Sequence, residues 1–345
     1  MSSFWDTLPR PIWALAPMED VTDAAFRRLI ARYGKPDVMF TEFTSADGLI
    51  LADEKGQRRI RKKLIYSESE RPIAAQLFSA VPEYMEKAAQ IVADLGFDGV
   101  DINIGCPVDE VVRQECGAAL IKNPVLAREL IRAAKKSGLP VSIKTRTGYT
   151  KDELDAWLPE LLAESPAAIA IHARTRKEMS AVPAQWERVK RAVEIRNEMN
   201  SDTLIIGNGD VRDIAEARVK AAETGCDGVM LGRAIYGNPW LFAERDNLPT
   251  PAERITALTE HLSLFDELLS GTTSFAIIAE QSSDMPASLG RDESKLSPRS
   301  SFAVMKKHFK AYISGWDGAK ELRVRLMESE NVAEAQKTLS EYLQV

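Results

Sequence analysis

Eight short apolar runs recur through the first 231 residues, and they constrain the fold of this chain more than any other feature. Each run is nearly continuous in apolarity and most are rich in Val or Ile, which is typical of strands buried on both faces of a parallel sheet. We interpret each run as one strand. The runs are Ile12–Ala16, Val38–Thr41, Ile73–Phe78, Gly99–Asn103, Val141–Lys144, Ala168–His172, Thr203–Ile206 and Gly228–Leu231.

Helical patterns lie between these runs, at Asp23–Tyr33, Pro82–Leu95, Pro124–Lys136, Leu154–Glu164, Glu187–Met199 and Ile214–Glu223. Strand and helix alternate about eight times over roughly 240 residues, which is the count and length of a closed (β/α)₈ TIM barrel. An open doubly wound sheet is the alternative, and a phosphate-binding GxGxxG should then follow the first strand. Ala16-Pro17-Met18-Glu19-Asp20 stands there instead. The sequence therefore favours the α/β barrel.

The pattern changes after Phe242, because no further strand-like run appears and Leu248-Pro249-Thr250-Pro251 interrupts the chain. Thr250 and Glu253 form a capping-box pattern around Pro251, which predicts a helix start. We predict a barrel domain over 1–248 and a C-terminal all-helical domain over 249–345. A serine-rich stretch at about 270–301 is predicted to be a long loop inside that helical domain.

Composition limits the classes of function. The 45 Lys and Arg against 51 Asp and Glu leave a net charge of −6, so any polyanion must be bound by a local basic patch. Three cysteines with no CxxC and no zinc-ligand spacing predict no metal site and a reducing, cytoplasmic compartment. The opening residues do not resemble a signal peptide, and no run approaches the roughly 18 apolar residues of a membrane span. We expect no association with a membrane.

Polar side chains stand where the predicted strands end. In a parallel barrel these positions meet at one rim, which is where active sites of such barrels are built. A barrel with a purely structural role would not need them, so we predict that they form one site. They are Pro17-Met18-Glu19, Glu42, Gln76, Asn103 with Cys106, Lys144 with Arg146, His172 with Arg174, Asn208-Gly209-Asp210 and Gly232-Arg233.

The residue types at this rim indicate a phosphate-bearing cofactor. Glycine turns follow the seventh and eighth strands, where such barrels bind phosphate through backbone N–H groups. Lys144 would place a fixed positive charge beside a flavin ring, and Gln76 offers both a donor and an acceptor to the ring edge. Cys106, on the short turn Gly105-Cys106-Pro107, is positioned to act as a nucleophile or a proton donor. A structural role for His172 stays open.

Eight separated stretches resemble the tRNA-dihydrouridine synthase family, and they follow one another in order over the whole predicted barrel. They are LAPMEDVTDAAFR, TEF at 41–43, AAQLFSA, GVDINIGCP with CGAALIKNP behind it, VSIKTRTGY, IHARTR, IGNGDV and DGVMLGRAIYGNPWLF. The C-terminal part is similar to the family's helical domain in position and type, with less specific sequence.

The resemblance implies FMN at the barrel mouth, NADPH as reductant, and reduction of the C5–C6 double bond of a uridine in tRNA. It implies that Cys106 is the proton donor, that Asn103 and Arg146 hold the uracil, and we add Arg174 as a third substrate-binding candidate. The positions that match flavin-binding residues are Pro17, Met18, Glu19, Gln76, Lys144, His172, Asn208, Gly209, Asp210, Gly232 and Arg233. We expect a monomer.

Hydride arriving at C6 of the uracil would build negative charge on O4 and C5, so an acid on the opposite face must protonate C5. Cys106 should therefore stay protonated until then. The uridine must also leave the RNA stack to reach the barrel. Candidates for binding the RNA backbone are Arg58, Arg59, Arg61, Lys62 and Lys63 in one run, and Lys306, Lys307, Lys310, Arg323 and Arg325 in the helical part.

The chain departs from the family pattern at two positions. Asp20 stands where glycine is frequent, and Met179-Ser180 stands where many members carry an aromatic residue that packs on the uracil. Two other functions remain open on the residues alone. One is an FMN barrel oxidoreductase acting on a small pyrimidine or enone. The other is an RNA-binding protein that uses the barrel without catalysis.

Overall fold

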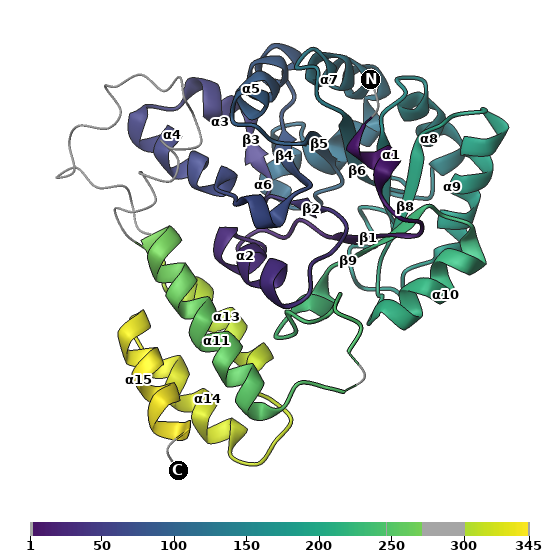
Figure 1. Ribbon diagram of the computed structural model, residues 1–345. Coiled ribbons are helices and arrows are strands. Elements are labelled where there is room, and N and C mark those ends of the chain that lie inside the picture. Colours follow the sequence, from purple (N-terminus) through teal and green to yellow (C-terminus); the bar gives the residue numbers. More distant parts are fainter. Residues whose placement is uncertain (1–2, 246, 271–300, 344–345) are drawn as a thin grey trace.

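The computed structural model describes residues 3–245, 247–270 and 301–343 (Figure 1). Residues 271–300, which make up nearly all of the predicted serine-rich loop, lie outside the described residues. Within the described ranges, no helix combines the length and the apolarity that a membrane crossing requires.

The strands form one parallel barrel, as predicted. The neighbours run in the order β1-β9-β8-β7-β6-β5-β4-β2, with β3 also pairing with β4, and a bridge between Ala14 and Val38 joins the two ends. The strands are β1 (Ile12–Leu15), β2 (Met39–Phe40), β3 (Thr44–Ser45), β4 (Ile73–Phe78), β5 (Gly99–Ile104), β6 (Val141–Arg146), β7 (Ala168–His172), β8 (Leu204–Asn208) and β9 (Gly228–Leu231).

Helices surround the barrel (Figure 1). Six of them agree with the predicted patterns to within about two residues: α2 (Ala24–Tyr33), α5 (Pro82–Asp94), α7 (Pro124–Lys135), α8 (Leu154–Leu162), α9 (Trp186–Glu198) and α10 (Ile214–Thr224). The sequence analysis missed the short elements, because a helix of one or two turns shows little periodicity. These are α1 (Phe4–Thr7), α3 (Ala46–Leu51), α4 (Glu54–Arg61), α6 (Asp109–Arg113), η1 (Lys62–Leu64), η2 (Glu68–Glu70), η3 (Gly117–Lys122) and η4 (Arg233–Ile235).

The barrel interior is filled from the end opposite the predicted site. Trp5 of α1 packs into the inner core with small residues such as Ala74 and Ala170, and its side chain is fully buried. Phe4 of α1 lies against Gly99, the first residue of β5. Since α1 covers the end where the strands begin, the end where the strands finish is left open to a ligand in the described part of the chain.

Two strands are longer than predicted by two residues at the site end. β6 continues to Arg146 and β8 continues to Asn208. Arg146 pairs with His172 in the ladder, and His172 pairs with Asn208. We predicted earlier ends because the residues become polar there, but the backbone ladder extends regardless of polarity when the side chains enter a site instead of the core.

The C-terminal helices form a separate group beside the barrel (Figure 1). They are α11 (Pro251–Phe265) with a π-helical extension, η5 (Asp266–Ser270), then α13 (Ala303–Tyr312), α14 (Ala319–Glu328) and α15 (Val332–Leu343). The predicted capping box is confirmed: Glu253 N–H donates to the Thr250 hydroxyl at 3.3 Å, and Thr250 N–H donates to the Glu253 carboxylate at 2.8 Å.

The barrel and the C-terminal helices meet at an aromatic cluster. The Phe26 ring of α2 stacks on His261 of α11 and meets His308 of α13 edge-on, both at 4.9 Å between centroids. All three side chains are fully buried. Close approach is also needed at Gly237, where a Cβ would lie 2.4 Å from the backbone of Ala311 and φ is +65°. The joint is therefore tightly packed.

Both ring nitrogens of His261 are buried and lack a hydrogen-bond partner within the described residues. Burial, followed by the proximity of His308, lowers the pKa of His261 well below its ordinary value. The folded protein therefore holds this imidazole neutral, whereas the unfolded chain binds a proton below about pH 6.5. Since the unfolded state then binds more protons, this group makes stability fall as pH falls.

His261→Phe should reduce this acid sensitivity, because it keeps the stacked ring and removes the titrating group. At pH 7.5 the free energy of unfolding should change by less than about 1.5 kcal/mol. Below pH 6.5 the variant should lose stability less steeply than the wild type, by up to about 1.4 kcal/mol per pH unit. Urea unfolding between pH 5 and 8 measures this. Parallel curves for both proteins would contradict the assignment.

Candidate active site

A pocket of about 230 Å³ lies at the end of the barrel where the strands finish. Its lining includes every predicted cofactor-binding residue except Glu19 and Gln76: Pro17, Met18, Lys144, His172, Asn208, Gly209, Asp210, Gly232 and Arg233. Arg174 and Ser180 line it as well. Nine of the eleven predicted cofactor-binding positions therefore line one cavity.

The backbone after β8 is shaped for close approach. Gly209 has a φ of +135°, and a Cβ there would lie 2.7 Å from the Cβ of Ala184 and 3.3 Å from the His172 ring. Only glycine fits this position without movement of its neighbours. At Gly232 an added Cβ would make only ordinary contacts, at 3.5 Å and beyond. The steric requirement for glycine thus lies in the Asn208-Gly209-Asp210 turn.

Positive charge exceeds negative charge in the pocket. Lys144, Arg174 and Arg233 contribute cations, and Asp210 is the carboxylate among the lining residues. Asp210 accepts hydrogen bonds from Arg174, from Arg233 at 2.6 Å and from the Ala184 N–H at 2.8 Å. Burial alone would raise the pKa of Asp210, but the bonds from Ala184 and Arg174 hold it below its ordinary value. An anionic ligand would balance the remaining charge.

His172 is neutral in this setting. Burial, and then the nearby Lys144 and other cations, lower the pKa of His172 to about 2. Arg174 Nη1 lies 3.0 Å from His172 Nε2. Because a guanidinium only donates, Nε2 must accept, and we assign the ring proton to Nδ1. His172 thereby presents a hydrogen-bond donor without adding charge to the pocket.

Lys144 points into the barrel mouth from β6, with its Nζ 3.3 Å from Asn208 Oδ1. Burial, and then Arg146, lower the pKa of Lys144 to about 8. The ammonium is still mostly charged at neutral pH. Its proton is therefore more acidic than that of an exposed lysine. The ammonium lies where its electric field would act on a ring bound in the barrel mouth.

A chain of buried amides lies below the pocket. Gln76 Nε2 donates to Asp101 at 2.7 Å, and Asn103 Nδ2 donates to Gln76 Oε1 at 3.0 Å. Ser142 donates to the other oxygen of Asp101 at 2.6 Å. Burial raises the pKa of Asp101 to about 6. The sequence analysis missed Asp101, although an acidic residue inside the apolar run GVDINI was a signal for it.

Three hydrogen bonds hold the turn that carries Cys106. Asn103 Oδ1 accepts from Gly105 N at 3.1 Å and from Cys106 N at 2.9 Å, and Ala118 N donates to Cys106 O at 3.0 Å. The Cys106 side chain is partly exposed. Burial raises the pKa of Cys106, against smaller lowering effects that include Arg146 and Lys144. At neutral pH this side chain is therefore a protonated thiol.

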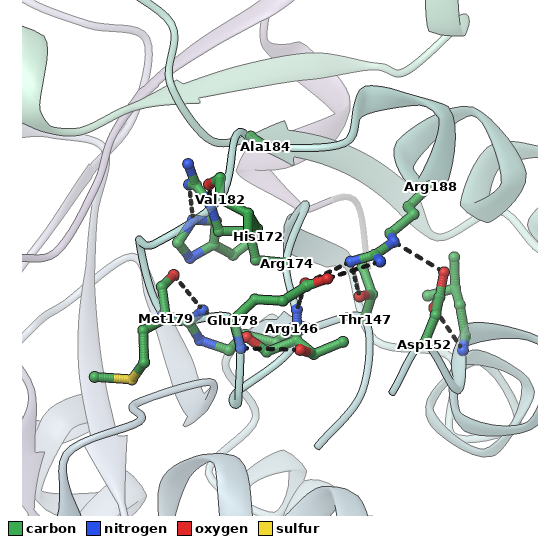
Figure 2. A network of polar contacts seen from close by, with 12 residues as sticks. Arg146, Thr147, Asp152, His172, Arg174, Glu178, Met179, Val182, Ala184 and Arg188 are labelled. Carbon is green, nitrogen blue, oxygen red and sulfur yellow. Dashed lines mark hydrogen bonds and ion pairs between the residues drawn. The ribbon is translucent and has the colours of Figure 1, made fainter. Parts of the chain in front are cut away.

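Arg146 joins the loop after β5 to the loop after β7. Its Nε donates to Gly105 O at 2.8 Å, and its Nη1 donates to Thr175 O at 3.1 Å. Nη1 also donates to the carbonyl of Met179 at 3.2 Å (Figure 2). Its Nη2 has no hydrogen-bond partner among the described residues. Burial lowers the pKa of Arg146 to about 10, so it stays charged at neutral pH.

The two predicted flavin-side residues outside the pocket make other contacts. Gln76 belongs to the amide chain, and Glu19 pairs with Lys63.

Asp20 has a φ of +55°, the left-handed conformation that glycine adopts freely and Asp tolerates. The Asp20 N–H donates to buried Glu42 at 2.6 Å. Burial, and then Asp23, raise the pKa of Glu42 to about 8.

Three residues of the predicted basic run bind protein groups, the first being Arg58, which pairs with Glu54 of the same helix. Lys62 is buried and donates to Leu269 O at 3.2 Å, and Lys63 pairs with Glu19. The prediction that Lys62 contacts RNA is wrong, because this residue is buried and its ammonium is bonded to η5. In the helical part, Lys306, Lys307, Lys310 and Arg323 line one groove with Val324 and Met327.

Comparison with known proteins agrees with this geometry. A sequence model described as dihydrouridine synthase matches residues 14–345. A probable tRNA-dihydrouridine synthase of Staphylococcus aureus (strain COL) is 38% identical over 341 residues, covering 99% of this chain and 95% of the relative. Probable tRNA-dihydrouridine synthase 2 of Bacillus subtilis (strain 168) is also 38% identical, covering 99% of this chain and 96% of the relative.

A solved structure of histamine dehydrogenase from Rhizobium sp. 4-9 shares the fold, with a TM-score of 0.51 and 14% identity over 76% of this chain and 51% of that one. The family match spans both the barrel and the C-terminal helices, and it includes every residue of the pocket. The chain belongs to the dihydrouridine synthase family.

Proposed function

We propose that the protein reduces the C5–C6 double bond of a uridine in tRNA to 5,6-dihydrouridine, with FMN in the mouth pocket and NADPH as reductant. The observation that carries this proposal is the position of Cys106, a thiol kept protonated by burial, on a turn that Arg146 and Asn103 hold at the same barrel mouth as the cation-rich pocket. The names of the relatives support tRNA as the substrate.

The pocket residues fit FMN. A phosphate would balance the excess of positive charge on Arg174 and Arg233, and backbone N–H groups of the Gly209 turn would donate to its oxygens. Lys144 would place positive charge beside the ring, and neutral His172 would offer a donor. When bound, FMN supplies the hydride that C6 of the uracil accepts.

The protein's own part is to orient the uracil and to supply a proton. Arg146 and Asn103 would hydrogen-bond the uracil carbonyls, which steadies the ring and stabilises the negative charge that develops on O4. The Cys106 thiol would then donate its proton to C5, and the resulting thiolate would be stabilised by Arg146 and Lys144. Arg174, which holds His172 and Asp210, remains a proposed substrate-binding residue.

The groove in the C-terminal helices is the proposed contact for the RNA backbone. Lys306, Lys307, Lys310 and Arg323 bring four cations to it, and the half-exposed side chains of Val324 and Met327 lie beside them. Lys307 also pairs with Asp20 of the barrel at 3.0 Å, so the groove adjoins the loop that leads into the pocket. RNA bound there would place a flipped-out uridine near the barrel mouth.

The cellular setting follows from the same proposal. All three cysteines are free thiols, which suits a reducing compartment. We place the enzyme in the cytoplasm, acting as a monomer on tRNA.

Cys106→Ala should abolish the proton transfer while leaving the cofactor pocket intact, because Cys106 does not line that pocket. The purified wild type, loaded with FMN, should be reduced anaerobically by NADPH and reoxidised by unmodified tRNA with formation of dihydrouridine. In the variant, reoxidation by tRNA should slow by at least about 100-fold, with flavin content unchanged. Stopped-flow flavin absorbance measures both rates. Reoxidation by a small enone but not by tRNA would overturn the proposal.

Charge reversal in the groove should weaken RNA binding. With Lys306→Glu and Lys310→Glu combined, we expect a loss of affinity for tRNA of about 10-fold or more and a shallower dependence on salt, because phosphate contacts are lost. Filter binding at several salt concentrations measures this. Lys320→Glu combined with Lys337→Glu is the matched control, since both residues are exposed in the same helical part and neither lines the groove. Equal affinity in all three proteins would remove the groove from the RNA site.

A further inference from the structure

The loop between β7 and α9, residues 173–185, forms part of the setting of Arg146 (Figure 2). Two backbone carbonyls of this loop, at Thr175 and Met179, accept hydrogen bonds from Arg146 Nη1. The same guanidinium donates through Nε to Gly105, the residue before Cys106. The position of the loop therefore determines where Arg146 can sit, and Arg146 in turn contacts the turn that carries the thiol.

The loop is itself held by an ion pair that lies behind it. The Glu178 carboxylate accepts two hydrogen bonds from Arg188 of α9, at 2.7 and 3.0 Å, and a third from the Thr175 N–H at 2.7 Å. Arg188 also pairs with Asp152 at 3.0 Å (Figure 2). The side chains of Arg188 and Glu178 are only 14% and 23% exposed, so solvent screens this pair less than a surface pair.

The loop backbone needs such restraint. Met179, directly after Glu178, has a φ of +53°, a conformation that residues other than glycine adopt rarely. Its side chain is 44% exposed, so packing does little to hold it. Arg146 therefore donates to the carbonyl of Met179, and the backbone conformation of Met179 depends on the contacts that Glu178 makes.

We propose that Glu178 and Arg188 are positioning residues. Their bidentate ion pair fixes the position of the loop carbonyls that accept hydrogen bonds from Arg146. Through Arg146 the pair also fixes the position of the turn that carries Cys106. Neither residue lines the pocket, so both act through Arg146. Only the expected effect on catalysis rests on the proposed function. Its effect on the Cys106 thiol can be measured without any substrate.

The reactivity of Cys106 provides that measurement, because the thiolate is the form that iodoacetamide alkylates. Arg146 stabilises this thiolate, so moving Arg146 away should raise the pH at which Cys106 becomes reactive. Glu178→Gln removes a negative charge, and a direct electrostatic effect alone would lower that pH. A rise in the pH at which Cys106 becomes reactive therefore indicates displacement of Arg146, whereas a fall indicates only the loss of the Glu178 charge.

A second variant avoids any change of charge. Arg188→Lys keeps the cation but cannot make the two-pronged contact with Glu178. Arg191→Lys is the matched control, since Arg191 lies on the same helix and pairs with Asp155 and Glu198 on the exposed side, away from the loop. Both Lys variants should remain folded, which a thermal melt checks.

The experiment alkylates the full-length protein with iodoacetamide across pH 6 to 11 and follows the Cys106 peptide by mass spectrometry. We expect the reactivity midpoint to rise by about half a pH unit or more in Glu178→Gln and Arg188→Lys, and to stay unchanged in Arg191→Lys. A midpoint that is unchanged or lower in both test variants would overturn the proposal.

The catalytic consequence is measured separately. In both test variants the single-turnover reoxidation of reduced flavin by tRNA should slow on the order of 10- to 100-fold, with flavin content and the tRNA dissociation constant within about twofold of wild type. A loss of tRNA affinity with an unchanged rate would show a role in RNA docking instead and overturn the proposal. If wild-type protein does not respond to tRNA at all, the proposed function fails, while the alkylation comparison still decides the role of the pair.

Discussion

The register of the closed parallel barrel is the constraint on which the rest of the structure depends. Successive side chains of a strand point to opposite faces, so inward positions are two residues apart. In β6, Lys144 and Arg146 share the inward face, and the ladder sets Arg146 beside His172 and His172 beside Asn208. Asn103 pairs with Lys144 in the same way. A slip of one residue in any strand would turn its polar side chains towards the surrounding helices.

This arrangement concentrates positive charge in a region from which water is largely excluded. Lys144 and Arg146 have lowered pKa values, chiefly because burial disfavours their charged forms. His172 is neutral for the same reason, and it is held by Arg174. The fold tolerates this because Asp210 and the loop carbonyls accept the hydrogen bonds of the arginines. The excess of positive charge in the pocket favours an anionic ligand.

The C-terminal helices are joined to the barrel by packing as well as by charge. The aromatic cluster around Phe26 is fully buried, and Gly237 allows α13 to approach the barrel backbone. Lys62 and Lys307 add contacts from each side. Because α2 follows directly from the loop that carries Met18 and Asp20, the surface proposed to bind RNA and the pocket share one structural element. A buried joint of this kind restrains the position of one surface relative to the other.

Much of this could be read from the sequence. Strand and helix patterns predicted the barrel, the surrounding helices and the helix start at Thr250, because these depend on local periodicity and capping. The residues at the strand ends, such as Lys144, His172 and Gly209, could also be placed at one rim, since a parallel barrel brings all its strand ends together.

Tertiary structure decided what those side chains contact. Asp101 joins Gln76 in a buried chain, Lys62 donates a hydrogen bond to Leu269 of η5, and Trp5 packs into the closed end of the barrel. The partners of Arg146 lie more than 25 residues away along the chain, on loops whose shape depends on Glu178 and Arg188. Periodicity and capping report on neighbours within a few residues, whereas contacts between distant loops form only when the closed barrel brings the loops together.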